Sequence, residues 1–160
     1  MPVNIIAAVA RNRAIGYRNQ LLYNLPNDMR HFKELTTGHT VIMGRRTYES
    51  LPHGALPNRR NIVLSRSVRN LPGCEVYGSL DEALTACAAD EEVFVIGGES
   101  VYGEAMTHAL RLYLTEVDDT PKQFDTSFPP YDGWKKDAEE LHYADERHAF
   151  NYSFVTYLRK

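Results

Sequence analysis

Cysteine and long apolar runs are both scarce in this sequence. Cys74 and Cys87 are the only cysteines among 160 residues, too few for the disulfide framework that small secreted proteins use to reinforce a weak core. No apolar run approaches the roughly 20 residues that a membrane-spanning helix needs. The first six residues also lack a basic segment followed by a cleavage site. These absences predict a cytoplasmic protein with two reduced thiols and no contact with a membrane.

An excess of charge of one sign is also missing. The 18 Lys and Arg residues nearly balance the 21 Asp and Glu residues, which leaves a formal net charge of −3. Nucleic-acid-binding domains usually show a basic excess, so we expect no nucleic-acid partner. The six His and two Cys residues show no spacing typical of metal ligands, such as C-x-x-C or H-E-x-x-H. The sequence therefore predicts no metal site.

The composition that is present is that of an ordinary globular protein, with 43% hydrophobic and 24% charged residues. A chain of 160 residues fits one domain and is long enough to build its own hydrophobic core. Nothing in the sequence requires a partner protein. We therefore expect a single domain over residues 1–160 and a monomer.

Apolar runs alternate with helical segments along most of the chain. Short β-rich runs predict strands at residues 3–10, 40–44, 61–65, 75–77, 93–96 and 111–117. Proline, glycine and capping residues bound predicted helices at 26–36, 45–51, 80–89 and 99–107. This alternation predicts an α/β fold with a mostly parallel central sheet flanked by helices on both faces.

The C-terminal part departs from this alternation. Residues 134–143 and 150–158 both resemble strands, and no helix separates them, so we expect a C-terminal antiparallel hairpin. In the second of these strands, Phe150, Tyr152, Phe154 and Leu158 share one face, with polar residues between most of them. The sheet is therefore predicted to end with a strand that has one apolar side.

Two local signals concern the connections. The polar segment Arg11–Asn24 is long for a connection in a compact domain, and long loops are often functional. Ser79 and Glu82 have the spacing of a capping box, in which each side chain satisfies the free N–H group of the other.

Asp28 is the most informative single residue. Leu25, Asp28, Phe32 and Leu35 fall on one helical stripe, at spacings of three, four and three residues. One interpretation is that Asp28 only complements the helix dipole from the first turn. The other is that this acid binds a ligand, because a carboxylate on a core-facing stripe is costly without donors. Two adjacent N–H groups of a ligand would supply them.

Glycine and arginine residues mark the ends of three predicted strands. Gly97-Gly98 separates a buried strand from a helix, an arrangement that lets backbone N–H groups approach a phosphate. Gly44-Arg45-Arg46-Thr47 repeats it with two arginines, which oppose the helix dipole unless an anion bridges them. Ser65-Arg66 adds a hydroxyl and a third guanidinium. These residues favour a nucleotide with phosphates at both ends; the alternatives are tight turns and a solvated basic rim.

Arg59 and Arg60 stand at the start of a strand, directly after the loop at residues 52–58. One of them can be an ordinary surface charge. The other interpretation is that an arginine at a cleft binds a carboxylate of the substrate through its forked N–H groups.

Several of these segments also match a known family, in order and across the whole chain. The matching pieces are Ile6-Ala7-Ala8, Ile15-Gly16, Leu25-Pro26-Asn27-Asp28, Val41-Ile42-Met43-Gly44-Arg45, Leu56-Pro57-Asn58-Arg59, Ile96-Gly97-Gly98 and Tyr113-Leu114-Thr115. In this order and at nearly this spacing, they resemble the dihydrofolate reductase family. A shared fold alone gives one or two such matches and not an ordered series.

The resemblance implies NADPH-dependent reduction of 7,8-dihydrofolate to tetrahydrofolate, with hydride passing from nicotinamide C4 to pterin C6 and a proton reaching N5. It also implies that antifolates inhibit the protein. By resemblance, Asp28 accepts hydrogen bonds from pterin N3 and the 2-amino group, Thr115 supports Asp28, and Arg59 takes the glutamate α-carboxylate. Burial is expected to raise the pKa of Asp28. The other substrate-binding residues implied are Ile6, Ala7, Met29, Phe32, Leu51, Leu56, Ile96 and Tyr102.

The resemblance also implies a set of NADPH-binding residues. Ala8, Ile15 and Gly16 would face the nicotinamide. The residues implied for the pyrophosphate and nearby groups are Ile96, Gly97, Gly98, Glu99, Ser100, Val101 and Tyr102. Those implied for the adenosine end, including the 2′-phosphate, are Gly44, Arg45, Arg46, Thr47, Leu64, Ser65 and Arg66.

Two positions depart from the family pattern. Leu22-Tyr23 stand where the family commonly has Pro-Trp in its mobile active-site loop, and Tyr23 keeps a polar tip for a bound water. We assign Tyr23, with Asp28, to the catalytic residues. Glu99 follows the glycine pair, and we expect its side chain to point away from the phosphate and to cap the helix.

Two alternative functions stay open at this point. The pyrimidine reductase of riboflavin synthesis would explain the phosphate sites, but not Asp28 and Arg59 together. A nucleotide-binding module without turnover would need Gly97-Gly98 and Arg45, and would not need Asp28.

Overall fold

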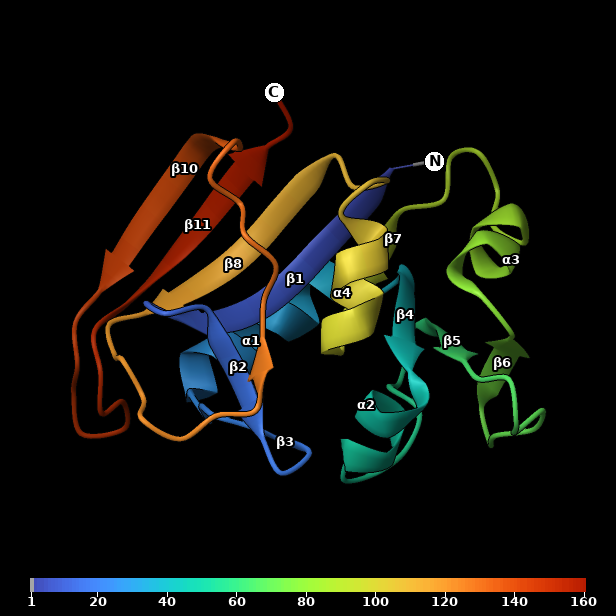
Figure 1. The fold of residues 1–160 in the computed structure, drawn as a ribbon, viewed down its shortest axis with the longest axis horizontal. Coiled ribbons are helices and arrows are strands. Elements are labelled where there is room, and N and C mark those ends of the chain that lie inside the picture. Colours follow the sequence, from blue (N-terminus) through green and yellow to red (C-terminus); the bar gives the residue numbers. More distant parts are fainter. Residues whose placement is uncertain (1) are drawn as a thin grey trace.

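The structure is a computed structural model that describes residues 2–160. Its centre is an eight-stranded sheet in the order β10-β11-β8-β1-β7-β4-β5-β6 (Figure 1). Six neighbouring strands run parallel, and β11 runs antiparallel to both β8 and β10. Their bounds are β1 Val3–Ala10, β4 Thr40–Gly44, β5 Arg60–Leu64, β6 Cys74–Tyr77, β7 Val93–Val95, β8 Arg111–Val117, β10 Lys135–His142 and β11 Tyr152–Leu158. The predicted α/β fold with a C-terminal antiparallel pair is confirmed.

Two helices cover each face of the sheet. Helices α1 (Pro26–Thr36) and α2 (Arg45–Ser50) pack on one apolar cluster, with Ile6, Val41 and Met43 at its base. Helices α3 (Leu80–Thr85) and α4 (Glu99–Ala105) pack on the other face (Figure 1). None of the helices in residues 2–160 is long and apolar enough to cross a membrane.

The central strand β1 shows why both faces need a cover. Ile5 and Val9 point into the cluster under α3 and α4, whereas Ile6 points into the cluster under α1 and α2. Side chains alternate between the faces of a strand, so a strand with apolar residues on both faces must be buried on both sides. The continuous run at 3–10 therefore sets the three-layer arrangement.

The polar segment at residues 11–24, predicted as one loop, contains a hairpin. Strands β2 (Ala14–Tyr17) and β3 (Gln20–Leu21) pair with each other, and β2 also pairs with β9 (Thr126–Ser127). Arg18 and Asn19 both adopt positive φ, at 50° and 63°, as a tight two-residue hairpin turn requires. The sequence signal was weak because Arg-Asn is not one of the usual glycine-containing pairs for this turn.

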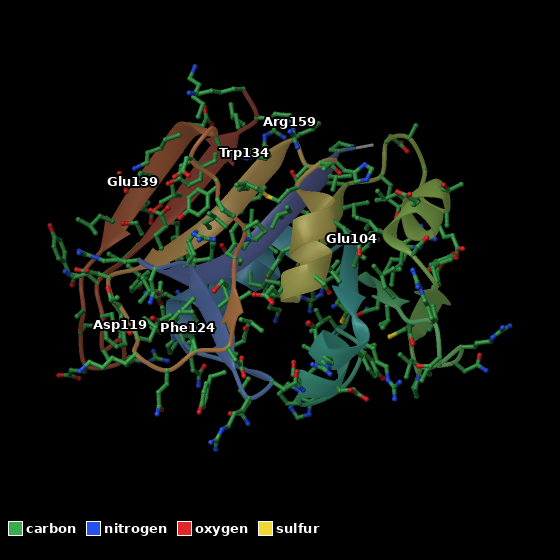
Figure 2. The ribbon with its side chains drawn as sticks, viewed as in Figure 1. Glu104, Asp119, Phe124, Trp134, Glu139 and Arg159 are labelled. Carbon is green, nitrogen blue, oxygen red and sulfur yellow. The ribbon has the colours of Figure 1, made fainter. Side chains whose placement is uncertain are left out.

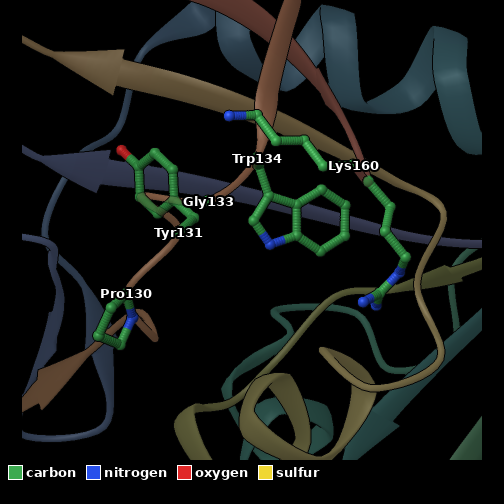
Figure 3. Close-up of a pocket in the computed structure, with 6 residues that line it drawn as sticks. Pro130, Tyr131, Gly133, Trp134 and Lys160 are labelled. Carbon is green, nitrogen blue, oxygen red and sulfur yellow. The ribbon is translucent and has the colours of Figure 1, made fainter.

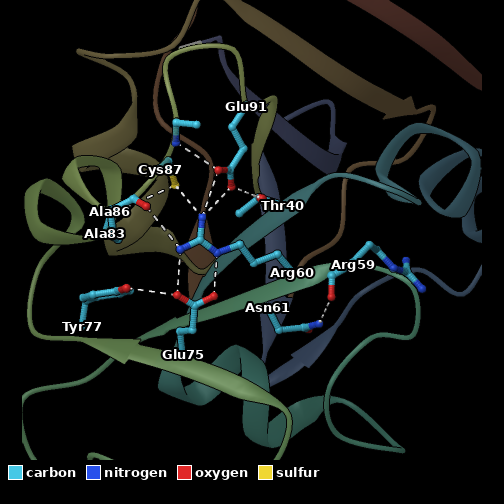
Figure 4. Close-up of polar contacts among 11 residues, drawn as sticks. Thr40, Arg59, Arg60, Asn61, Glu75, Tyr77, Ala83, Ala86, Cys87 and Glu91 are labelled. Atoms are coloured by element: carbon cyan, nitrogen blue, oxygen red, sulfur yellow. Dashed lines mark hydrogen bonds and ion pairs between the residues drawn. The ribbon is translucent and has the colours of Figure 1, made fainter.

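Helix α3 is shorter than predicted, and its capping box forms only in part. Ser79 accepts the N–H of Glu82 at 3.1 Å, but the Glu82 carboxylate accepts from Gly78 at 3.1 Å and not from Ser79. The helix ends at Thr85 and not near Ala89. Beyond its end, the guanidinium of Arg60 from β5 binds the carbonyl of Ala86, and Glu91, three residues further on, accepts the N–H of Ala88 at 3.1 Å (Figure 4).

The last strand is buried on both faces, which corrects the prediction of one apolar side. Tyr152 and Phe154 pack toward Leu25, whereas Val155 and Tyr157 belong to the cluster on the opposite face. Strand β11 lies between β8 and β10, so it is an interior strand. The pattern in the sequence missed this because the hydroxyl of Tyr157 looked polar; in the fold it donates to Glu116 at 2.6 Å.

Candidate active site

Asp28 lies in the first turn of α1, facing the middle of the sheet. The hydroxyl of Thr115, on β8, donates a hydrogen bond to the Asp28 carboxylate. Burial raises the pKa of Asp28 above its ordinary value, while the hydrogen bond from Thr115 and the nearby His31 act in the opposite direction. A buried acid that receives one hydroxyl donor keeps acceptor capacity for a ligand.

Apolar side chains next to Asp28 form one wall. Five residues predicted to contact the substrate belong to the same cluster on this face of the sheet: Ile6, Phe32, Leu51, Leu56 and Ile96. They come from β1, α1, the end of α2, the loop that follows it and the end of β7. The wall and the acid together suit a flat ring with polar atoms along one edge.

Three other residues predicted for the substrate lie differently. Met29 is 61% exposed on α1, so it stands at the rim. Ala7 packs into the cluster on the opposite face, which leaves only its backbone for this site. Tyr102 is buried in α4, and its hydroxyl donates to the carbonyl of Ile6 at 2.9 Å. Tyr102 therefore holds β1 in place from the other side of the sheet.

The structure separates the two neighbouring arginines. Arg60 forms a two-point ion pair with Glu75, at 2.6 and 2.7 Å, and also binds Glu91 at 2.9 Å (Figure 4). Arg59 points elsewhere, and within residues 2–160 no carboxylate lies within ion-pair distance of it. Its guanidinium donates to the hydroxyl of Thr36 at 3.1 Å and to the carbonyl of Pro57 at 2.8 Å. Arg59 is thus held in position while its charge is available.

Thr36 is a residue that the sequence did not indicate. It is buried at the end of α1, and its hydroxyl donates to the carbonyl of Phe32 at 2.8 Å while accepting from Arg59. A threonine in the last turn of a helix carries no sequence signal for such a role. Only the approach of Arg59 from a different segment shows it.

The glycine-rich ends of β4 and β7 meet side by side. The N–H of Gly44 donates to the carbonyl of Gly97 at 2.8 Å. Gly97 has φ +135°, which only glycine adopts easily, and a Cβ added there would lie 3.2 Å from the hydroxyl of Thr47. A side chain at Gly97 would therefore fill the space between β7 and α2. This open backbone is the cradle expected for a pyrophosphate.

Basic and hydroxyl side chains surround the neighbouring strand ends. Arg45 binds Ser67 at 3.0 Å and pairs with Glu49 at 3.3 Å, whereas Arg46 and Arg66 are exposed. The hydroxyl oxygen of Ser65 accepts the N–H groups of Ser67 and Val68. Strands β4 and β5 are hydrogen-bonded neighbours, so Arg45, Ser65 and Arg66 lie at one edge. A dianionic phosphate fits this donor set.

Three residues predicted for the active site, Ile15, Gly16 and Tyr23, lie in or just after the β2–β3 hairpin. They are next to the segment that joins β8 to β9 and to β9 itself. Ile15 is buried, and a Cβ on Gly16 would lie 2.6 Å from the hydroxyl of Thr126. The hydroxyl of Tyr23 donates to Asp119 at 2.9 Å; Figure 2 labels Asp119 on the joining loop. Burial and Asp119 both raise the pKa of Tyr23. The polar tip that we predicted would order a water is bonded to Asp119 instead.

The side chain of Glu99 bonds to β9 and does not cap α4. Its carboxylate accepts the N–H of Ser127 at 2.6 Å, and it makes no side-chain cap on α4. The prediction that Glu99 caps its helix is therefore wrong. The contact ties the start of α4 to β9, because the hairpin that contains β2 brings β9 to this point.

Two cavities lie away from these residues. One, of about 270 Å³, is lined by Pro130, Tyr131, Gly133, Trp134, Arg159 and Lys160 (Figure 3). The other, of about 520 Å³, lies at the ends of β1 and β8 beside Glu116. Neither is lined by a residue predicted for substrate or cofactor.

The fold and the site together define a class. Open glycine backbone at the carboxyl ends of parallel strands, beside an apolar wall with one half-buried acid, is typical of an enzyme that uses a nucleotide cofactor. The family model described as dihydrofolate reductase matches residues 2–159. The chain belongs to the dihydrofolate reductase family.

Individual relatives agree with the family match. The chain is 44% identical to dihydrofolate reductase type 3 of Salmonella typhimurium, over 100% of this chain and 99% of the relative. It is 40% identical to dihydrofolate reductase of Bacillus subtilis strain 168, over 99% and 95% of the two chains. A solved structure of dihydrofolate reductase from Enterococcus faecalis, complexed with NADP(H) and RAB-propyl, is 34% identical and has a TM-score of 0.90, over 99% and 96% of the two chains.

Proposed function

We propose that the apolar wall beside Asp28 and the glycine-rich strand ends bind dihydrofolate beside NADPH, with Asp28 as the residue that anchors the substrate. The activity itself, reduction of dihydrofolate to tetrahydrofolate with NADPH as the cofactor, follows from membership of the family. Neither the riboflavin-pathway reductase nor a module without turnover is needed to explain the chain. The observation that carries the assignment is the part-buried Asp28–Thr115 pair beside the apolar wall.

Substrate binding follows from three fixed groups. The carboxylate of Asp28 accepts hydrogen bonds from two adjacent N–H groups of the pterin, and the Thr115 hydroxyl holds the carboxylate in place. The wall of Ile6 and Phe32 takes the ring faces. Arg59, held by Thr36, takes the substrate's glutamate carboxylate.

The proposed NADPH site lies at the glycine-rich ends of β4 and β7 and at the neighbouring end of β5. The open backbone at Gly97 accommodates a pyrophosphate, since any side chain there would meet Thr47. Arg45, Ser65 and Arg66 form the proposed 2′-phosphate site. When it is bound, NADPH supplies the hydride. The chain supplies orientation: β1, through Ala8 and its neighbour Thr115 on β8, positions the reacting rings.

Asp28 is placed to bind one edge of the pterin, and we assign delivery of the N5 proton to a water molecule. While it donates to Asp119, the Tyr23 hydroxyl oxygen can still accept a hydrogen bond from such a water. Tyr23 is therefore a proposed catalytic residue.

The decisive assay follows NADPH oxidation with dihydrofolate as the only acceptor. We expect turnover that requires both compounds, and no turnover when dihydrofolate is omitted. If the correctly folded protein shows no dihydrofolate-dependent turnover, the proposal is refuted. We further propose that the protein is a cytoplasmic monomer inhibited by diaminopyrimidine antifolates. Light scattering of the protein as it elutes from a size-exclusion column tests whether it is a monomer. Inhibition of the NADPH-oxidation assay tests the effect of antifolates.

A further inference from the structure

Helix α1 carries Asp28, yet it has no cap of its own. Its N-cap residue is Leu25, whose side chain cannot accept a hydrogen bond. Pro26 has no N–H group, and the first intrahelical bond runs from Met29 to Leu25 at 3.0 Å. The N–H of Asn27 is therefore an orphan donor, one residue before the proposed substrate anchor.

His148 supplies the missing acceptor from the other end of the chain. Its Nε2 lies 3.2 Å from the N–H of Asn27, and its Nδ1 lies 2.8 Å from the carboxylate of Asp145. The side chain is only 3% exposed. An amide N–H can donate only to an unprotonated ring nitrogen, so His148 must be neutral with its hydrogen on Nδ1. Asp145 fixes that tautomer.

A rigid turn holds the imidazole in place. The backbones of Asp145 and His148 bond to each other in both directions, at 2.9 and 3.2 Å. Asp145 also accepts the N–H of Arg147 at 2.9 Å. On the far side of the ring lies Tyr152, whose hydroxyl accepts from the Asn27 side chain at 2.7 Å. The backbone N–H and the side-chain NH₂ group of Asn27 are thus both bound by this C-terminal segment.

The charged and titratable groups around His148 come from four elements. Its own turn contributes Asp145 and Arg147. Helix α1 contributes Asp28, the residue after Asn27. Strand β11 contributes Tyr152, and His142 of β10 stacks on Tyr152 at 5.1 Å. Of these, Asp145 is the one that bonds to the His148 ring.

We propose that His148 is a positioning residue for substrate binding: its neutral imidazole caps α1 and so fixes the Asp28 carboxylate against Thr115. The inference rests on the proposed role of Asp28. Without the imidazole, the N–H of Asn27 has no acceptor and the start of α1 is free to shift. Dihydrofolate binding therefore weakens when the imidazole is removed, whereas NADPH binding does not.

The test compares His148→Ala, which removes the acceptor, with His148→Gln, whose amide oxygen can accept from Asn27 and does not titrate. We expect His148→Ala to raise KM for dihydrofolate several-fold, with KM for NADPH unchanged, and His148→Gln to restore most of the loss.

Ser79→Ala is the matched control, because it removes the cap of α3, whose residues are not part of the proposed site. It is expected to lower the melting temperature and leave both KM values unchanged. If His148→Ala does not fold, ¹⁵N shifts of the imidazole in the unmodified protein still decide: the hydrogen on Nδ1 supports the cap.

A hydrogen on Nε2, or an unchanged KM for dihydrofolate in His148→Ala, would overturn the proposal. An Asp28→Asn variant with unchanged dihydrofolate binding would instead refute the role of Asp28, while the imidazole shifts would still report on the cap.

Discussion

Replacing Asp28 by Asn separates the two interpretations of this acid. Asparagine has nearly the same shape and still offers an oxygen to Thr115, but it loses the charge and turns an NH₂ group toward one ligand donor. If Asp28 anchors the substrate, the variant loses a charge-assisted hydrogen bond, worth about 1.5–3 kcal/mol. The Kd for a diaminopyrimidine antifolate, measured by calorimetry with NADPH present, should rise roughly 10- to 150-fold.

Although Asp28→Asn should weaken ligand binding, it should increase the stability of the folded protein. Burial raises the pKa of Asp28, so the folded protein holds this proton more tightly than the unfolded chain does. The ionised carboxylate therefore costs stability at neutral pH, and this cost disappears as the pH falls through the raised pKa toward the ordinary value. Asp28→Asn is expected to have a higher free energy of unfolding than the parent at pH 7, and nearly the same value at low pH.

A helix-dipole role would give the reverse pattern. An acid that only complements the N-terminus of α1 contributes about 0.3–1 kcal/mol, and its removal lowers stability without affecting ligands. Urea unfolding of both proteins at pH 7, together with the calorimetry, distinguishes the two cases. A less stable variant with unchanged antifolate affinity would refute the anchoring role.

Three further predictions concern other parts of the site. Thr36→Val removes the acceptor that holds Arg59, so KM for dihydrofolate should rise roughly 2- to 10-fold in steady-state assays; an equal rise in KM for NADPH would contradict this. Arg66→Ala should narrow the preference for NADPH over NADH about tenfold, whereas the exposed Arg69→Ala should not; an unaltered ratio excludes Arg66 from the phosphate site. Arg60→Met leaves Glu75 and Glu91 unpaired and should lower the free energy of unfolding by about 1–3 kcal/mol. Because Arg60 keeps the pKa of Glu75 low, this loss should shrink as the pH falls below the ordinary range of Glu, and a loss that does not vary with pH would argue against the ion pairs.

Local chemistry made much of the fold predictable from sequence. The apolar run at 3–10 and the helix from Pro26 to Thr36 appear where predicted, because strand periodicity, a proline in the first turn and a closing glycine act within a few residues. Elements that were missed or shortened include two with distant partners. The β2–β3 hairpin forms against β9, and Arg60 binds the carbonyl of Ala86 directly after the end of α3.

In the candidate site, too, residues with a local sequence signal could be identified, whereas contacts with distant partners could not. Asp28 and the two glycine-containing strand ends were identified as candidates from the sequence, since a lone acid on an apolar stripe and paired strand-end glycines next to arginines stand out locally. The residue pattern left Arg59 and Arg60 open, and only the family resemblance selected Arg59. That difference depends on Thr36 and on the two glutamates, which lie 15 and 31 residues from Arg60.

The sequence by itself determined the class of fold and the family, and through the family resemblance it predicted that Thr115 supports Asp28, a contact that the structure contains. Only the tertiary structure decided that the His148 imidazole caps α1 and that Tyr23 bonds to Asp119. The physical reason is that these partners are 121 and 96 residues apart in the chain. No short-range pattern records them, and they meet only when the sheet brings its strands together.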